Sequence, residues 1–142
     1  MAFKLYTDAA CTQVFSGVLS TVHYSDHSEG SLDYVFYFAD VERDPADNGA
    51  YKLVMLGGGN VNLSIVDSTP GSGHEATEIK TALTAGGLDG AAAGAPLSLG
   101  VAPLSGVSNA IPIHVRVTNA VTSAGVSVEL RLRKPEAVAL AA

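Results

Sequence analysis

The sequence has few of the residues that would stabilise a fold covalently or cover it with charge. Its single cysteine, Cys11, excludes an intramolecular disulfide and a multi-cysteine zinc site, so stability has to come from packing or association. Charged residues make up 15% of the chain, whereas an average soluble domain has about 25%. Much of the surface must therefore be neutral, which suits either contact with other proteins or a compact monomer.

The features that direct a chain to nucleic acid or to a membrane are missing as well. Eight Lys and Arg residues stand against fourteen Asp and Glu, so the net charge of −6 leaves no basic face for phosphates. No stretch approaches the roughly 18 apolar residues that a membrane span needs, and the first residues do not resemble a signal peptide. We expect a soluble, unprocessed chain with no nucleic-acid partner and no membrane partner.

What the sequence does contain is a series of short segments in which apolar and polar residues alternate. The clearest are residues 111–118 and 126–133, and the short segment between them is turn-like. We predict that the two form an antiparallel hairpin, with Pro112 at a sheet edge or among the first residues of its strand. Further strands are predicted at residues 3–6, 12–15, 34–38, 52–56 and 61–65.

These strands predict one all-β domain over residues 1–142, mainly antiparallel, built as a β-sandwich or as a jelly-roll-like barrel. One short helix is predicted over residues 74–83, where Ala76, Ile79 and Leu83 have helical spacing. Residues 86–96 are low in complexity and are expected to form a flexible arm. The tail, residues 135–142, is expected to fray or to dock on a neighbour.

The sequence contains two groups of candidate metal ligands, but the residues around each group do not match a metal-binding motif. His23 and His27 have a spacing that would place both imidazoles on one face of a helix, but their segment looks like a strand end entering a polar turn. Residues 40–47 contain several carboxylates, as calcium requires, but Pro45 and Tyr51 replace the turn glycine and the bidentate Glu of an EF-hand. We expect solvated loops and no metal site at both places; the alternative for residues 40–47 is an irregular calcium site.

Motifs for nucleophilic catalysis and for phosphate binding are equally weak. Ser72, His74 and Glu75 are close in sequence, but a catalytic triad is assembled from separate elements, and no Gly-x-Ser-x-Gly elbow is present. Residues 57–59 are all glycine but lack the Gly-Lys-Ser/Thr ending of a phosphate loop. We predict that the chain is not an enzyme and has no catalytic, metal-binding or cofactor-binding residue.

The order of the segments resembles that of small virion proteins of tailed bacteriophages, particularly β-sandwich decoration (cement) proteins of the capsid surface. The likeness lies in residues 3–10, 61–73, 97–100, 105–110 and 111–133, and it covers most of the chain through patterns of turns and strands. It carries over no functional residue. It implies a homo-oligomer, a trimer, made in the host cytoplasm, that binds the major capsid protein on the virion and stabilises the capsid.

Two other functions fit the same sequence. A phage tail or baseplate component would have the same sandwich architecture, and the sequence does not separate it from a capsid protein. A carbohydrate- or receptor-binding module would need an exposed aromatic platform, for which the candidates are Tyr24, Tyr34, Tyr37 and Tyr51.

Overall fold

The computed structural model describes residues 3–23, 31–68, 75–118, 125–133 and 137–142. Within these ranges the chain forms eleven β-strands and three single 3-10 turns. None of the described helical segments has the length and apolar character needed to cross a membrane.

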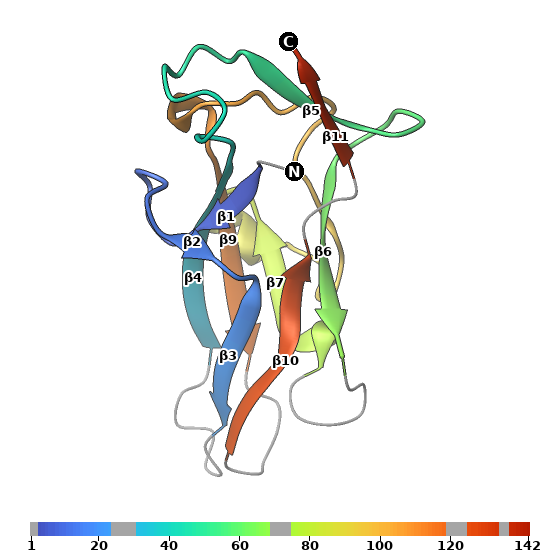
Figure 1. The fold of residues 1–142 in the computed structure, drawn as a ribbon. Helices are drawn as coiled ribbons and strands as arrows, with labels where there is room; N and C mark the ends of the chain where they lie inside the picture. Colours follow the sequence, from blue (N-terminus) through green and yellow to red (C-terminus); the bar gives the residue numbers. More distant parts are fainter. Residues whose placement is uncertain (1–2, 24–30, 69–74, 119–124, 134–136) are drawn as a thin grey trace.

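Two antiparallel sheets pack face to face, with a small third sheet at one end (Figure 1). The first sheet contains, in spatial order, β2 (Val14–Phe15), β1 (Lys4–Tyr6), β4 (Ser31–Ala39), β9 (Ile111–Thr118) and β7 (Ile79–Ala82). The second contains β3 (Val18–His23), β10 (Gly125–Arg133), β6 (Asn62–Asp67) and β8 (Leu97–Ser98). The third pairs β5 (Tyr51–Met55) with β11 (Ala137–Ala141).

Alternate residues of the central strands form the core between the two large sheets. Ile113 and Val115 of β9 are 0% exposed, as is Leu130 of β10, and all three belong to one cluster of buried apolar side chains. Burying an aliphatic side chain of this size contributes about 1.5–3 kcal/mol. The predicted all-β, antiparallel fold is therefore confirmed as a sandwich, and the sheets do not close into a barrel.

The hairpin predicted from β9 and β10 is wrong. β9 lies between β4 and β7, whereas β10 lies between β3 and β6 in the opposite sheet. Alternation identifies the residues that face the core, but it is the same whether the next strand stays in the sheet or crosses to the other one. The prediction for Pro112 is confirmed, because this residue is the second of β9 and lies beyond the last β7 pair, Ala82 with His114.

The helix predicted over residues 74–83 is also wrong. Ala76–Glu78 forms a single 3-10 turn, and Ile79–Ala82 continues as strand β7. Ile79 is 0% exposed and Thr81 is 8% exposed, so alternate residues of β7 face the core. Burial of two β-branched residues against the neighbouring strand outweighs the helical spacing, which is a weak preference.

The segments expected as an arm and a tail fold against the rest of the chain where the structure describes them. In residues 86–96, Leu88 is 1% exposed, and the Gly94 N–H donates to the Ile79 carbonyl at 2.8 Å. Asp89 accepts a hydrogen bond from Arg116 Nη1 at 2.7 Å. The tail forms β11, each residue of which pairs with one residue of β5. Composition alone did not reveal these contacts, because they depend on partners distant in sequence.

The arrangement of β9 predicts the outcome of a disulfide experiment. Val35 and His114 are paired across β4 and β9, so a variant with cysteine at both positions is expected to form an intramolecular disulfide. The matched control places cysteines at His114 and Glu129, which a β9–β10 hairpin would bring together but which lie on opposite sheets here. Mass spectrometry after mild oxidation gives the result, and a disulfide in the control variant would contradict the topology.

Candidate functional site

The small sheet at one end of the molecule has three components. β11 pairs with β5 on one side, and residues 103–105 pair with β5 on the other. The Leu53 N–H donates to the Pro103 carbonyl at 2.9 Å, and the Ser105 N–H donates to the Tyr51 carbonyl at 2.8 Å. We call β11, β5 and residues 103–105 the end sheet; Figure 1 shows its two strands at the top of the molecule.

The end sheet has one face toward the core and one toward solvent. Leu53 and Ser105 are 0% exposed, and Ala137 and Ala139 are partly buried against the core cluster. On the other face, Leu104, Val138 and Leu140 are 41%, 37% and 48% exposed.

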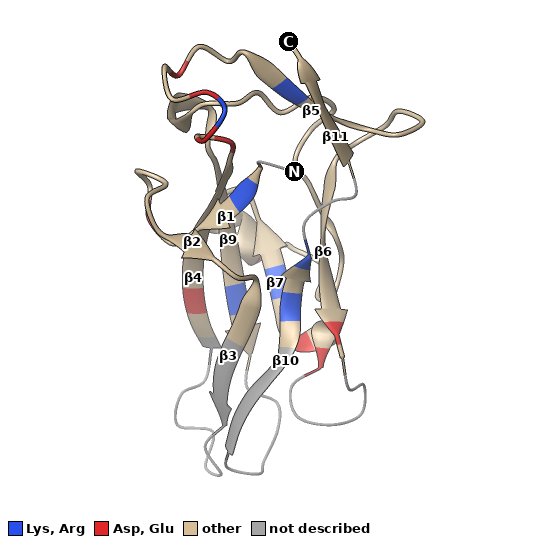
Figure 2. Cartoon of the chain, in the orientation of Figure 1, with Lys and Arg blue, Asp and Glu red and all other residues tan. Residues whose placement is uncertain are grey.

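The solvent face of the end sheet is almost free of charge. Val138 pairs with Val54 and Leu140 pairs with Lys52, which is the only charged residue of β5 and β11 (Figure 2). Apolar side chains grouped in this way on a neutral surface are typical of a protein-binding site.

A buried carboxylate organises the loop that leads into the end sheet. Asp44 is only 4% exposed. Its oxygens accept hydrogen bonds from the N–H groups of Asn48 (3.0 Å), Gly49 (2.8 Å) and Ala50 (3.2 Å), and from the Ser105 hydroxyl (2.8 Å). These bonds, that from Asn48 first, hold the pKa of Asp44 below its ordinary value, against the opposing effect of burial. Asp44 therefore serves as an internal acceptor.

The same network fastens residues 103–105 to β5. The Tyr51 N–H donates to the Ser105 hydroxyl oxygen at 3.0 Å, so this hydroxyl connects the start of β5 to Asp44. The next residue, Gly106, has φ 102°, and a Cβ atom there would lie 2.2 Å from Asp47 Oδ1. Only glycine fits where the backbone at Gly106 approaches the loop that contains Asp47.

The prediction of a solvated turn over residues 40–47 is wrong for Asp40 and Asp44, whose carboxylates are buried. Asp40 is 0% exposed and receives the Arg43 Nε–H at 3.1 Å, while Asp44 has the partners described above. Asp47 accepts from the N–H and the hydroxyl of Ser108 at 3.0 and 2.8 Å. Among the described residues, no three His, Cys, Asp or Glu side chains come together as metal ligands. The signal that could have found this network is the Asp-Asn-Gly turn at residues 47–49.

The other candidates of the sequence do not meet in the described structure. His23 is the last residue of β3, and its backbone pairs with Gly125. His27, Ser72 and His74 lie outside the described residues, so the absence of a metal pair and of a triad stays a prediction. Cys11 is buried, at 4% exposure, in a small cluster with Tyr6 and Ala39.

Three aromatic rings line a pocket of about 250 Å³ between the large sheets. The Phe15 and Phe36 rings stack with centroids 4.1 Å apart, and the Tyr34 ring lies 6.4 Å from that of Phe36. Tyr34 is 39% exposed. Among the described residues that line the pocket, only Tyr34 and Thr7 carry hydroxyl groups. Of the other proposed platform residues, Tyr51 lies under Arg43, Tyr37 is half-buried, and Tyr24 lies outside the described residues.

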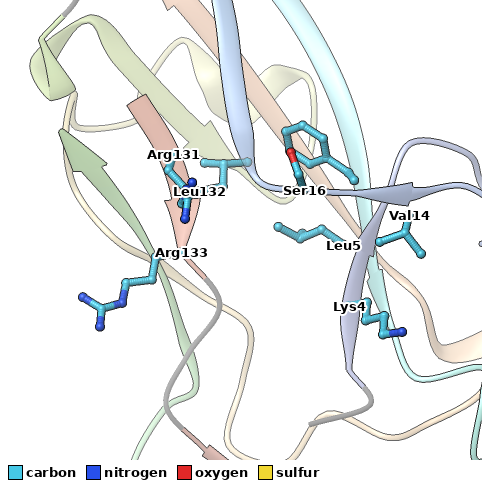
Figure 3. Close-up of a pocket in the computed structure, with 8 residues that line it drawn as sticks. Lys4, Leu5, Val14, Ser16, Arg131, Leu132 and Arg133 are labelled. Carbon is cyan, nitrogen blue, oxygen red and sulfur yellow. The ribbon is translucent and has the colours of Figure 1, made fainter. Parts of the chain in front are cut away.

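A cleft of about 370 Å³ separates β1 and β2 from the end of β10 (Figure 3). Lys4, Arg131 and Arg133 lie along it, but its walls include the aliphatic side chains of Leu5 and Leu132. Lys4 forms an ion pair with Glu42, and Figure 3 shows the charged ends of Lys4 and Arg133 pointing in opposite directions. The three cations therefore do not converge on one position that an anion would occupy.

Comparison with models of protein families, with curated proteins and with solved structures finds no match to this chain. The functional argument therefore depends on the chain's own surfaces, of which the end sheet is the most distinctive.

The Asp44 network predicts a pH-dependent effect of the Asp44→Asn substitution. The amide places N–H donors where the carboxylate accepts, so the variant is expected to have a lower free energy of unfolding at pH 7. Because folding lowers the pKa of Asp44, the carboxylate's stabilising effect is complete above its ordinary pKa of 3.8 and is lost as the pH falls through the folded-state value. The difference between variant and wild type should therefore shrink in acid.

Urea unfolding at a series of pH values from 7 down to 2 measures this difference. Glu42→Gln is the matched control, because this carboxylate is 54% exposed and its removal should have a small effect at every pH. A difference for Asp44→Asn that stays constant over the whole range would contradict the assigned role of the carboxylate.

Proposed function

We propose that this chain is a structural virion protein of the capsid decoration type. It binds the outside of a phage capsid through the major capsid protein and through copies of itself, and it stabilises the particle without catalysis. The observation that carries the proposal is the neutral, apolar solvent face of the end sheet, with Leu104, Val138 and Leu140 exposed beside a single lysine.

This face supports binding to a protein surface on physical grounds. Each square ångström of apolar surface removed from water contributes about 25 cal/mol, and the centres of protein interfaces are depleted in charged side chains. The contribution of one small patch is modest. On a symmetric capsid, however, neighbouring copies raise the effective concentration of every contact, so weak individual contacts give firm binding.

A receptor- or carbohydrate-binding module is the second candidate, favoured by the stacked rings of Phe15, Phe36 and Tyr34 beside their pocket. Sugar recognition requires several hydrogen-bonding groups around such a platform. Two hydroxyl groups among the lining residues provide few of them. The pocket therefore supports this function less strongly than the end sheet supports assembly on a protein surface.

The proposal predicts that Leu104→Glu weakens binding to capsids by about tenfold or more, because a carboxylate would be buried in an apolar contact. The matched control is Leu83→Glu, which places the same charge at another leucine of similar exposure, 44% against 41%. Co-sedimentation of the purified protein with particles of the phage that encodes it, lacking their own copies, measures the affinity.

Two results would contradict the proposal. One is the absence of binding to assembled capsids by the wild-type protein. The other is electron-microscopic density for the chain on the tail only, which would favour a tail or baseplate component.

A further inference from the structure

The edge strands of the described sheets differ in how far they are protected against pairing with another chain. β2 and β8 have two residues each, which is too short to serve as a template. β7 contains Lys80, and Gly94 hydrogen-bonds to its Ile79 carbonyl. β3 has six residues, but three of them are polar and its pairing with β10 contains a bulge, which twists an edge. β11 has five residues, all apolar, without a proline or a charge. It is the least protected of these edges.

The hydrogen bonds of the end sheet identify the free backbone groups of β11. The N–H of Leu53 points away from β11, toward Pro103, whereas the N–H of Ala142 donates to the Ala50 carbonyl. Because antiparallel pairs alternate between bonded and non-bonded, Val138 and Leu140 bond to β5. The N–H and C=O groups of Ala137, Ala139 and Ala141 therefore point to the open edge, and no described strand pairs with it.

We propose that this edge pairs with the same edge of a second copy, antiparallel across a two-fold axis at Ala139. Ala139 then faces Ala139 of the second copy, and Ala137 faces its Ala141. The three pairs exchange both backbone hydrogen bonds and use every free group of the strand. Val138 and Leu140 of the two copies meet on the solvent face, so the two end sheets become one sheet with a continuous apolar stripe.

The sequence of β11 favours a second copy over an unrelated partner. The chain has a net charge of −6, so two copies repel each other over most of their surface. β11 brings no charge to the contact, and its sequence Ala-Val-Ala-Leu-Ala places small residues against small ones and large against large when it is reversed on itself. A closed two-fold contact also occupies the β11 edge of both copies, so further copies cannot add through β11.

The contact is small, so pairing in solution should be weak. A five-residue edge buries less than the roughly 1,000 Å² of a stable interface, so we expect a weak dissociation constant, on the order of 0.1–1 mM. The pairing would be the contact between copies that the proposed function requires. It rests on that function only for its occurrence on a capsid, where effective concentrations reach the millimolar range. Self-pairing is measured on the isolated protein without capsids, so its result is independent of the result for capsid binding.

Sedimentation equilibrium of the isolated protein from 10 µM to 1 mM tests the pairing. The weight-average mass should rise from 14.5 kDa toward twice that value. Ala139→Pro removes a donor at the free edge without removing a bond to β5, and it should keep the protein monomeric over the same range. Circular dichroism confirms that this variant is folded.

A second pair of variants tests the self-pairing independently, in case the proline at position 139 disturbs the end sheet. Leu140→Lys places a charge beside the edge and should abolish the rise in mass, whereas Val14→Lys places it on β2 at a valine that is 59% exposed and should leave the rise unchanged. A wild-type protein that stays monomeric at 1 mM, a species of three copies, or undiminished association of Leu140→Lys would overturn the proposal.

Discussion

The carboxylate of Asp44 is the interaction on which the end of the molecule depends. It satisfies three consecutive N–H groups of the loop before β5 and, through Ser105, connects that loop to a segment 61 residues later in the chain. The Ser105 hydroxyl is in turn bonded to the first residue of β5. A buried charge is tolerated at this position because four donors hydrogen-bond to it, and leaving those donors unpaired would be costly. The network fastens residues 103–105 to β5, so the position of Leu104 on the solvent face of the end sheet depends on it.

Much of the sandwich could be predicted from the sequence because it depends on local alternation. The strand predicted at residues 111–118 has the bounds of β9, and Ile113, Val115 and Val117 face the core as their spacing requires. Strand neighbours could not be predicted in the same way. The inward-facing pattern of β10 fits either sheet, and the choice between them depends on contacts with β3 and β6. In β7, two residues buried against β9 overrode a helical spacing.

The candidate site could be predicted only in part. The cluster of carboxylates at residues 40–47 was visible, but the partner that explains Asp44 is a serine in an unremarkable loop far along the chain. The sequence predicts a tail where β11 forms, since alanine has little preference for a strand and the conformation comes from pairing with β5. The edge that supports self-pairing and the face that supports capsid binding are therefore both consequences of long-range contacts. Together they give an acidic protein one sheet face that is apolar and nearly free of charge, which is the physical basis for the proposed structural role.

Amide hydrogen exchange in β11, followed residue by residue by NMR, tests the central claim most directly. In dilute protein, the amides of Val138 and Leu140 should be protected by β5, while those of Ala137, Ala139 and Ala141 should exchange freely at the open edge. At millimolar concentration, the three alanine amides should become protected in step with the rise in mass. Alanine amides that are already protected in dilute protein, or that stay unprotected in the associated protein, would contradict the account.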